Sequence, residues 1–173
     1  LRNGALVIDM GTTAVPATRR VAALIEEKGA SYIDAPVSGG TIGAENGTLI
    51  VMAGGDDHAF ERAKPVLSIF GSRITHVGEI GAGQVAKAAN QVIVGLTIGA
   101  VAEALALARA AGVNPARVIE ALRGGFADSR VLEVHGQRMV ERNFAPGAKC
   151  TIQRKDMHQT LEFAATLDLD LPT

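Results

Sequence analysis

The amino-acid sequence predicts an α/β fold followed by an all-α part, and three observations support this prediction. Short apolar runs alternate with helical patterns in residues 1–80, which is the order expected of a doubly wound α/β sheet. Residues 81–173 carry no convincing strand pattern. A helix of unusual length begins directly after this change. We therefore expect two domains, over residues 1–80 and 81–173.

The first three strands and the first helix follow from apolar runs and their boundaries. Residues 5–9 form an unbroken apolar run that ends in an acid, which is typical of a strand buried on both faces. A helix is predicted over residues 16–28, because it opens with a proline and Gly29 follows it. The next strands are predicted over residues 31–34 and 49–53.

One more helix and one more strand complete the first part. Asp56 or Asp57 is expected to cap a helix that runs to Phe70, with Pro65 as a kink inside it. The last strand is predicted over residues 73–77. Strand and helix thus alternate throughout this part.

Glycine and proline also mark the ends of the helices in the second part. Gly112 ends the long helix, and Asn114 with Pro115 opens the next one. The four predicted helices cover residues 84–111, 114–123, 129–142 and 151–167.

Composition excludes several classes of protein. With 47% hydrophobic and 20% charged residues, the 173-residue chain can bury a core and is not disordered. A net charge of −1 and 3% aromatic residues argue against a nucleic-acid partner. The single cysteine, Cys150, cannot form an internal disulfide, so we expect a cytoplasmic protein with an inert thiol.

The long helix is the most apolar part of the chain. Its unbroken apolar run, Val92 to Ala102, is shorter than the ~20 residues of a membrane span, so no membrane partner is expected. Apolar residues lie on nearly every face, so the helix must be surrounded. Further helices or a second subunit must cover it, and we expect a homo-oligomer.

Lys87 and Asn90 are the strongest candidates for a site. They are three residues apart, so they share one face of the long helix. The positive end of the helix dipole and partial burial both lower the pKa of a lysine there, which suits a general acid or base. The alternative is a surface lysine whose stem covers Ala88 and Val92.

Two turns could complete a site for a small carboxylate. Ser38, Gly39 and Gly40 follow a strand end, where open α/β sheets place ligands, and glycines let a ligand approach the backbone. The alternative is an ordinary turn. Thr12 and Thr13 also follow a strand, and the alternative for them is a polar cap on the helix that begins near residue 16.

The segment Gly81-Ala82-Gly83 resembles a dinucleotide-binding turn but lacks its context. That fingerprint requires a short helix and then a strand that ends in an acid about 20 residues on, whereas here the helix continues. We therefore predict a tight strand-to-helix turn.

Other polar residues give weaker signals. Lys155 and Asp156, taken alone, read as a solvated pair. The four histidines have no ligand spacing, so no metal site is expected.

Several motifs in order resemble those of the β-hydroxyacid dehydrogenase family, and the likeness covers essentially the whole chain. They are Asp34–Gly40, Asn46–Gly55, Gly83–Gln91 and Arg154–Asp156. Residues 123–129 and 142–147 look most like the tartronate semialdehyde (2-hydroxy-3-oxopropionate) reductases of that family.

The resemblance implies an NAD(P)-dependent oxidoreductase that reduces a short semialdehyde acid, with Lys87 as the catalytic acid or base. It assigns the substrate to Ser38, Gly39, Gly40 and Asn90, and the cofactor to Thr13 and Lys155. Gly11-Thr12 departs from the Ser-Ser or Ser-Thr that is usual there, so the role of Thr12 stays open.

For the fold, the resemblance implies the C-terminal part of a Rossmann-type dinucleotide-binding domain, joined by the long helix to a truncated helical domain. The pyrophosphate turn and the residue that selects NAD or NADP are expected outside this chain. Family members look like dimers or tetramers built through the helical domain. The alternatives are a 3-hydroxyisobutyrate dehydrogenase, a glyoxylate/succinic semialdehyde reductase, or a non-catalytic dimerisation or binding module.

Overall fold

A computed structural model describes residues 1–172, which form two compact units. One unit comprises Leu1–Asn90 with Cys150–Pro172, and the other comprises Gln91–Lys149. The long helix α4 (Ala82–Ala110) contributes to both. The domain boundary predicted at residue 80, where strands give way to helices, stays a prediction.

The first unit contains all the strands predicted from the sequence, each within a few residues of its expected ends. Asp56 caps the helix α3 (Asp57–Phe70) as expected, because its Oδ1 accepts a hydrogen bond from Ala59 N at 2.9 Å. Besides the start of α4, the elements are β1 (Leu6–Asp9), α1 (Val15–Glu26), β2 (Ser31–Asp34), β3 (Val37–Ser38), α2 (Gly40–Glu45), β4 (Leu49–Gly54), α3 (Asp57–Phe70), β5 (Gly71–Gly78) and α7 (Cys150–Ala165).

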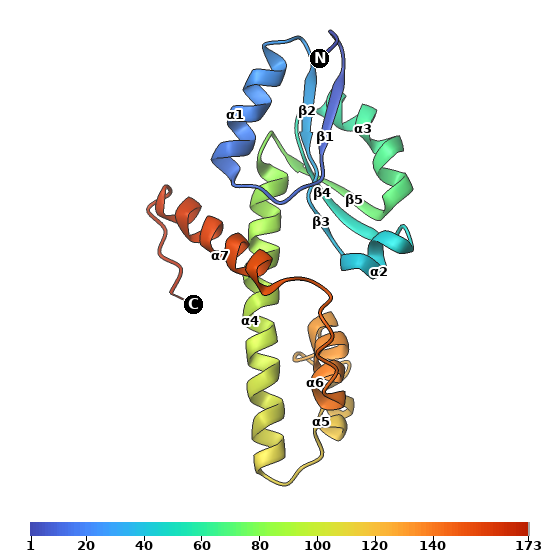
Figure 1. The fold of residues 1–173 in the computed structure, drawn as a ribbon, viewed down its shortest axis with the longest axis vertical. Coiled ribbons are helices and arrows are strands. Elements are labelled where there is room, and N and C mark those ends of the chain that lie inside the picture. Colours follow the sequence, from blue (N-terminus) through green and yellow to red (C-terminus); the bar gives the residue numbers. More distant parts are fainter. Residues whose placement is uncertain (173) are drawn as a thin grey trace. The chain divides into compact units, whose positions relative to one another are not determined.

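The strands form one mixed sheet with helices on both sides. β1 pairs with β2 and β4 with β5 in parallel, whereas β4 runs antiparallel to β2 and β3. The change of direction follows from the connection over residues 39–48, which is shorter than a parallel crossover requires. Figure 1 shows α1 and α3 on either side of the strands. The core beneath α3 joins Ile33 and Val51 to Ala63 and Leu67.

Two strand ends meet at one edge of this sheet. Asp9 at the end of β1 is in register with Asp34 at the end of β2. The carboxyl ends of parallel strands are where α/β sheets place ligands. The turn into α1 and the segment that leads into β3 both start from this edge.

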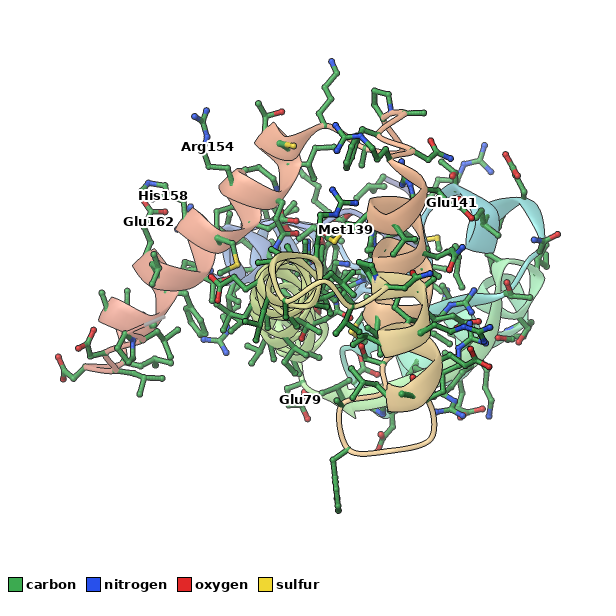
Figure 2. All side chains as sticks on the ribbon, turned by 90° about the horizontal axis from the view of Figure 1, so that it is seen from below. Glu79, Met139, Glu141, Arg154, His158 and Glu162 are labelled. Atoms are coloured by element: carbon green, nitrogen blue, oxygen red, sulfur yellow. The ribbon has the colours of Figure 1, made fainter. Side chains whose placement is uncertain are left out.

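The second unit is all helical, as predicted. It contains the rest of α4, α5 (Pro115–Leu122), a π-helical turn η1 (Leu132–Gly136) and α6 (Gln137–Glu141). The π-helical turn lies inside the helix predicted over residues 129–142, where an apolar pattern gives no sign of it. Met139 extends from α6 (Figure 2) and packs on the core of this unit. The core residues are Val101, Leu105, Ile119 and Leu132.

Helix α4 is far more exposed than the sequence pattern suggested. An 18-residue window has a mean hydropathy of 1.9, yet only 22% of it is buried within this chain. By length and composition alone the helix could cross a membrane, so the unbroken apolar run underestimated its apolar length. The core helix of a water-soluble protein passes the same test of length and composition. Because most of this apolar window is not buried within the chain, its exposed faces require a cover.

Candidate functional site

The glycine turn before α4 wraps around a carboxylate of the chain itself. Asp34 is fully buried, and its two oxygens accept hydrogen bonds from Gly81 N at 2.7 Å and Gln84 N at 2.8 Å. Burial raises the pKa of Asp34, although these two donors act in the opposite direction. Because Asp34 occupies the N-terminus of α4, the geometry agrees with the predicted tight turn and not with a pyrophosphate site.

Steric crowding explains why the second glycine of that turn, Gly83, has no side chain. A Cβ atom on Gly83 would collide with the carbonyl oxygens of Met52 and Asp34. The backbone of α4 thus lies directly against the ends of β2 and β4. The start of the helix is fixed to the same edge of the sheet that carries the turn after β1.

Lys87 lies one turn further along α4 and is buried. Its exposed fraction is 8%, so the alternative of a surface lysine is wrong. Burial lowers the pKa of the Lys87 ammonium, and the Asp156 carboxylate opposes this by favouring the charged form. The predicted direction of the shift is therefore correct in the structure. The sequence pattern gives no sign of this counter-charge, because Asp156 lies on α7, far along the chain.

Asp156 is a buried residue and not half of a solvated pair, so that interpretation is wrong. It is 4% exposed, and the same face of α7 buries Thr160 and Ala164. Figure 2 shows Arg154, His158 and Glu162 on one side of this helix, at the same spacing of four. Two residues in isolation could not reveal the faces of the helix. The spacing of 156, 160 and 164 could have done so.

Lys155 reaches from α7 to the turn after β1. Its Nζ donates to Thr12 O at 2.8 Å and forms an ion pair with Asp156 Oδ1 at 2.7 Å. Neighbouring residues of one helix thus serve two purposes. Lys155 holds the Thr12 turn, and Asp156 supplies negative charge to Lys87.

The turn at Thr13 is tied to both α1 and α4. Thr13 N donates to Gln84 Oε1 at 3.1 Å, and the Thr13 and Thr18 hydroxyl groups are 2.6 Å apart. The alternative role as a helix cap is wrong, because the N-cap residue of α1 is Ala14 and no side chain caps that end. The structure therefore brings Thr13, Lys155 and the first turn of the Lys87 helix together.

The proposed carboxylate turn has the backbone that its glycines permit. Gly39 and Gly40 have φ values of +133° and +63°, which residues with a Cβ atom rarely adopt. Ser38 pairs with Ile50 of β4, and the turn leads into the short helix α2. Asn90 is half-buried on α4, one turn beyond Lys87. The substrate-binding roles of these residues stay predictions.

Among residues 1–172, no group of three or more His, Cys, Asp or Glu side chains is placed to hold a metal ion. The chemical groups that the structure does place at the sheet edge are the buried lysine, its counter-charge and the hydrogen-bonded turn.

Two family profiles together match nearly the whole chain. The profile described as the NAD-binding part of NADP-dependent 3-hydroxyisobutyrate dehydrogenase matches residues 81–173. The profile of the NAD-binding domain of 6-phosphogluconate dehydrogenase matches residues 1–78.

Comparison with individual proteins agrees with these two profiles. The chain is 51% identical over 169 residues to 2-hydroxy-3-oxopropionate reductase of Escherichia coli strain K12, covering 98% of this chain and 58% of that protein. It is 31% identical to the crystal structure of 3-hydroxyisobutyrate dehydrogenase from Salmonella typhimurium, with a TM-score of 0.88 and coverage of 99% and 61%. The Mycobacterium tuberculosis 3-hydroxyisobutyrate dehydrogenase solved with L-serine is 33% identical, with a TM-score of 0.87 and coverage of 99% and 61%. The chain thus spans less than two thirds of each of these proteins.

Proposed function

We propose that the whole protein is an NAD(P)-dependent oxidoreductase that reduces a short semialdehyde acid. The proposal starts from the family, since this chain belongs to the β-hydroxyacid dehydrogenases. Tartronate semialdehyde (2-hydroxy-3-oxopropionate) is the substrate we favour, since the relative at 51% identity is named for it. The observation that carries the proposal is the buried Lys87 with Asp156 as its counter-charge, on the helix whose Gln84 binds the turn at Thr13.

Lys87 is proposed to move the proton of the reaction. Its Nζ gives a proton to the carbonyl oxygen of the semialdehyde during reduction, and takes it back in the reverse direction. Burial disfavours the charged form and so makes the amine a better proton donor than an exposed lysine. The negative charge of Asp156 opposes this effect on the pKa of Lys87 and favours the protonated amine, which is the form that gives the proton.

Thr13 and Lys155 are proposed to hold the nicotinamide half of the cofactor, as the family resemblance implies. In support, Thr13 is exposed at the carboxyl end of β1, and Lys155 reaches the same turn. The start of α4 does not fit the pyrophosphate, because the Asp34 carboxylate fills it. When bound, the reduced cofactor supplies the hydride.

Ser38, Gly39, Gly40 and Asn90 are proposed to bind the substrate carboxylate. The two glycines have no Cβ atom to cover their backbone, they adopt the positive φ values that this turn requires, and both are exposed. A carboxylate could therefore approach the backbone closely there. The Ser38 hydroxyl and the Asn90 amide would donate further hydrogen bonds to the substrate carboxylate. Lys87 then does not have to pair with that carboxylate, and its proton stays available for the carbonyl oxygen.

A direct assay tests this function. The full-length protein is mixed with NADH or NADPH and, in separate reactions, with tartronate semialdehyde, methylmalonate semialdehyde, succinic semialdehyde or glyoxylate, and cofactor oxidation is followed by absorbance. We expect the highest kcat/KM for tartronate semialdehyde. A preference for methylmalonate semialdehyde would indicate a 3-hydroxyisobutyrate dehydrogenase. Turnover of none of these acids would favour the non-catalytic module.

Asp156→Asn should move the alkaline limb of the pH–rate profile for reduction to lower pH. The substitution removes the charge that raises the pKa of Lys87, so burial acts unopposed and the pKa falls further. Because the protonated amine is the proton donor, activity is lost at a lower pH than in the wild type. The measurement is kcat/KM for reduction as a function of pH.

Glu162→Gln is the matched control for Asp156→Asn. It removes one negative charge from the exposed side of the same helix, where Glu162 pairs with His158 at 3.2 Å. Its profile should match the wild type, since an exposed charge is screened. If the pH–rate profile of Asp156→Asn superimposes on those of the wild type and Glu162→Gln, Asp156 is excluded as the counter-charge of Lys87.

We also propose that a second copy of the protein covers the exposed face of α4. That face presents Ile93, Leu96 and Leu107, which are 65%, 42% and 71% exposed. Large apolar side chains exposed together on one helix face indicate an interaction surface. The resemblance to enzymes built as dimers or tetramers through this part of the chain favours a copy of the same chain over a membrane.

Ile93→Lys should therefore dissociate the oligomer, because it places a charge in an apolar interface. We expect the dissociation constant to rise ~10-fold or more, measured by light scattering over a dilution series. Leu24→Lys on α1 is the control, since Leu24 is similarly exposed at 58% but lies outside this face. A wild-type monomer at high micromolar concentration would contradict the proposal, and recovery with lipid vesicles would instead indicate a membrane.

A further inference from the structure

We propose that Gln84 is a positioning residue, whose side-chain amide sets the place of the Gly11–Thr13 turn relative to Lys87. This inference rests on the proposed function, because it concerns the two groups that the reaction must align. The turn would hold the nicotinamide half of the cofactor, and Lys87 would supply the proton. Gln84 touches neither reacting group in this proposal and acts through the turn.

The Gln84 side-chain amide binds the turn through both its nitrogen and its oxygen. Its Nε2 donates to Gly11 O at 2.8 Å, and its Oε1 accepts from Thr13 N at 3.1 Å. The pair of bonds mimics the way one strand binds another, so it fixes both distance and orientation. Gln84 is 2% exposed, so water does not readily replace these bonds.

The backbone of Gln84 is fixed as firmly as its side chain. Gln84 N donates to the buried Asp34 carboxylate at 2.8 Å, which ties this residue to the end of β2. Lys87 follows three residues later on the same helix, about 4.5 Å along the axis. One side chain therefore connects the turn to a rigid helix, and the helix carries the lysine.

Three further contacts hold the turn but cannot replace this one. Gly11 N donates to Asp9 Oδ1 at 2.8 Å, which is a bond to the end of β1 just before the turn. Lys155 is bound at Thr12 O through a long side chain that is partly exposed, and Thr18 binds only the Thr13 hydroxyl group. None of these contacts connects the turn to α4. Loss of the Gln84 amide should thus allow the turn to shift relative to Lys87, and a displacement of ~1 Å can cost up to ~10²-fold in rate.

The test is Gln84→Met in the full-length protein, which keeps the length of the side chain and removes both hydrogen bonds. We expect kcat to fall ~10- to 100-fold with little change in the KM of the semialdehyde. Amide hydrogen exchange at Thr13 should accelerate, because its acceptor is lost, while the amides of the central strands keep their protection. Gln137→Met removes the exposed bond of another glutamine to Glu141 and should change neither quantity.

The outcomes separate this inference from the proposed function. A wild-type protein without activity would remove the proposed function, and exchange at Thr13 would still test Gln84. Unchanged kcat and unchanged exchange in Gln84→Met would overturn the positioning role. Faster exchange at all amides with a lower melting temperature would also overturn it, in favour of a purely structural residue. If Gln84→Met fails to fold, Gln84→Asn, whose amide is one methylene too short to make both bonds, should show the same fall in kcat.

Discussion

Lys87→Ala is expected to lower kcat of the full-length protein by ~10²–10⁴, which is the usual contribution of a general acid or base. The substitution removes the buried amine that is proposed to protonate the carbonyl oxygen. Cofactor affinity should change little, because Thr13 and Lys155, which would hold the nicotinamide half, are untouched. The measurement is the rate of a single turnover with pre-bound cofactor, together with the dissociation constant of the cofactor.

Two variants make this result specific to the buried amine. Lys64→Ala removes an exposed lysine that pairs with Glu61 at 3.4 Å, and it should leave kcat unchanged. Lys87→Arg keeps the positive charge but cannot release a proton near neutral pH, so it should be as inactive as the alanine variant. A Lys87→Ala enzyme with near wild-type turnover would contradict the catalytic assignment.

Most of the secondary structure could be predicted because its signals are local. Asp56 and Asn114 stand directly before their helices, and both accept the expected cap hydrogen bonds at 2.9 Å. The direction of β4 could not be predicted from periodicity, since an apolar run identifies a strand but not its partner. The short connection over residues 39–48 contained the only clue, because it cannot span a parallel crossover.

Only part of the site could be predicted from the sequence, because local patterns do not identify contacts between distant residues. Lys87 could be found because its position on an apolar helix implies burial. Gln84 and Asp34 could not, because their partners lie far away in the sequence. The Gln84 side chain binds residues 71 and 73 positions away, and the Lys155 bond to Thr12 spans 143 positions. Only a folded sheet edge brings these groups together.

The long helix shows the same limit on a larger scale. Its apolar faces correctly indicated that something must cover them, because apolar area exposed to water is unfavourable. The pattern contains no information on what provides the cover. Within this chain the cover is small, since 22% of the apolar window is buried. The oligomer therefore needs its own measurement and cannot be deduced from hydropathy.

Asp34→Ala should strongly destabilise the fold, because it leaves the Gly81 and Gln84 amides without their acceptor at a buried helix start. Each orphaned donor costs about 1–3 kcal/mol, so the free energy of unfolding should fall by about 2–6 kcal/mol. Urea unfolding at neutral pH measures this loss. Asp56→Ala removes a cap of the same chemistry at the exposed start of α3, and it should cost only about 0.5–2 kcal/mol.

The pH dependence of the difference provides a second check on Asp34. Burial raises its pKa in the folded state, so the folded protein binds a proton more tightly than the unfolded chain. Stability from this group is therefore fully present at acid pH and is lost as the pH rises through the raised pKa. The loss of stability caused by Asp34→Ala should accordingly be larger at acid pH than at neutral pH. A difference that grows with rising pH would mean that the two amide donors outweigh burial, and Asp34 would then be a charged anchor of the Lys87 helix.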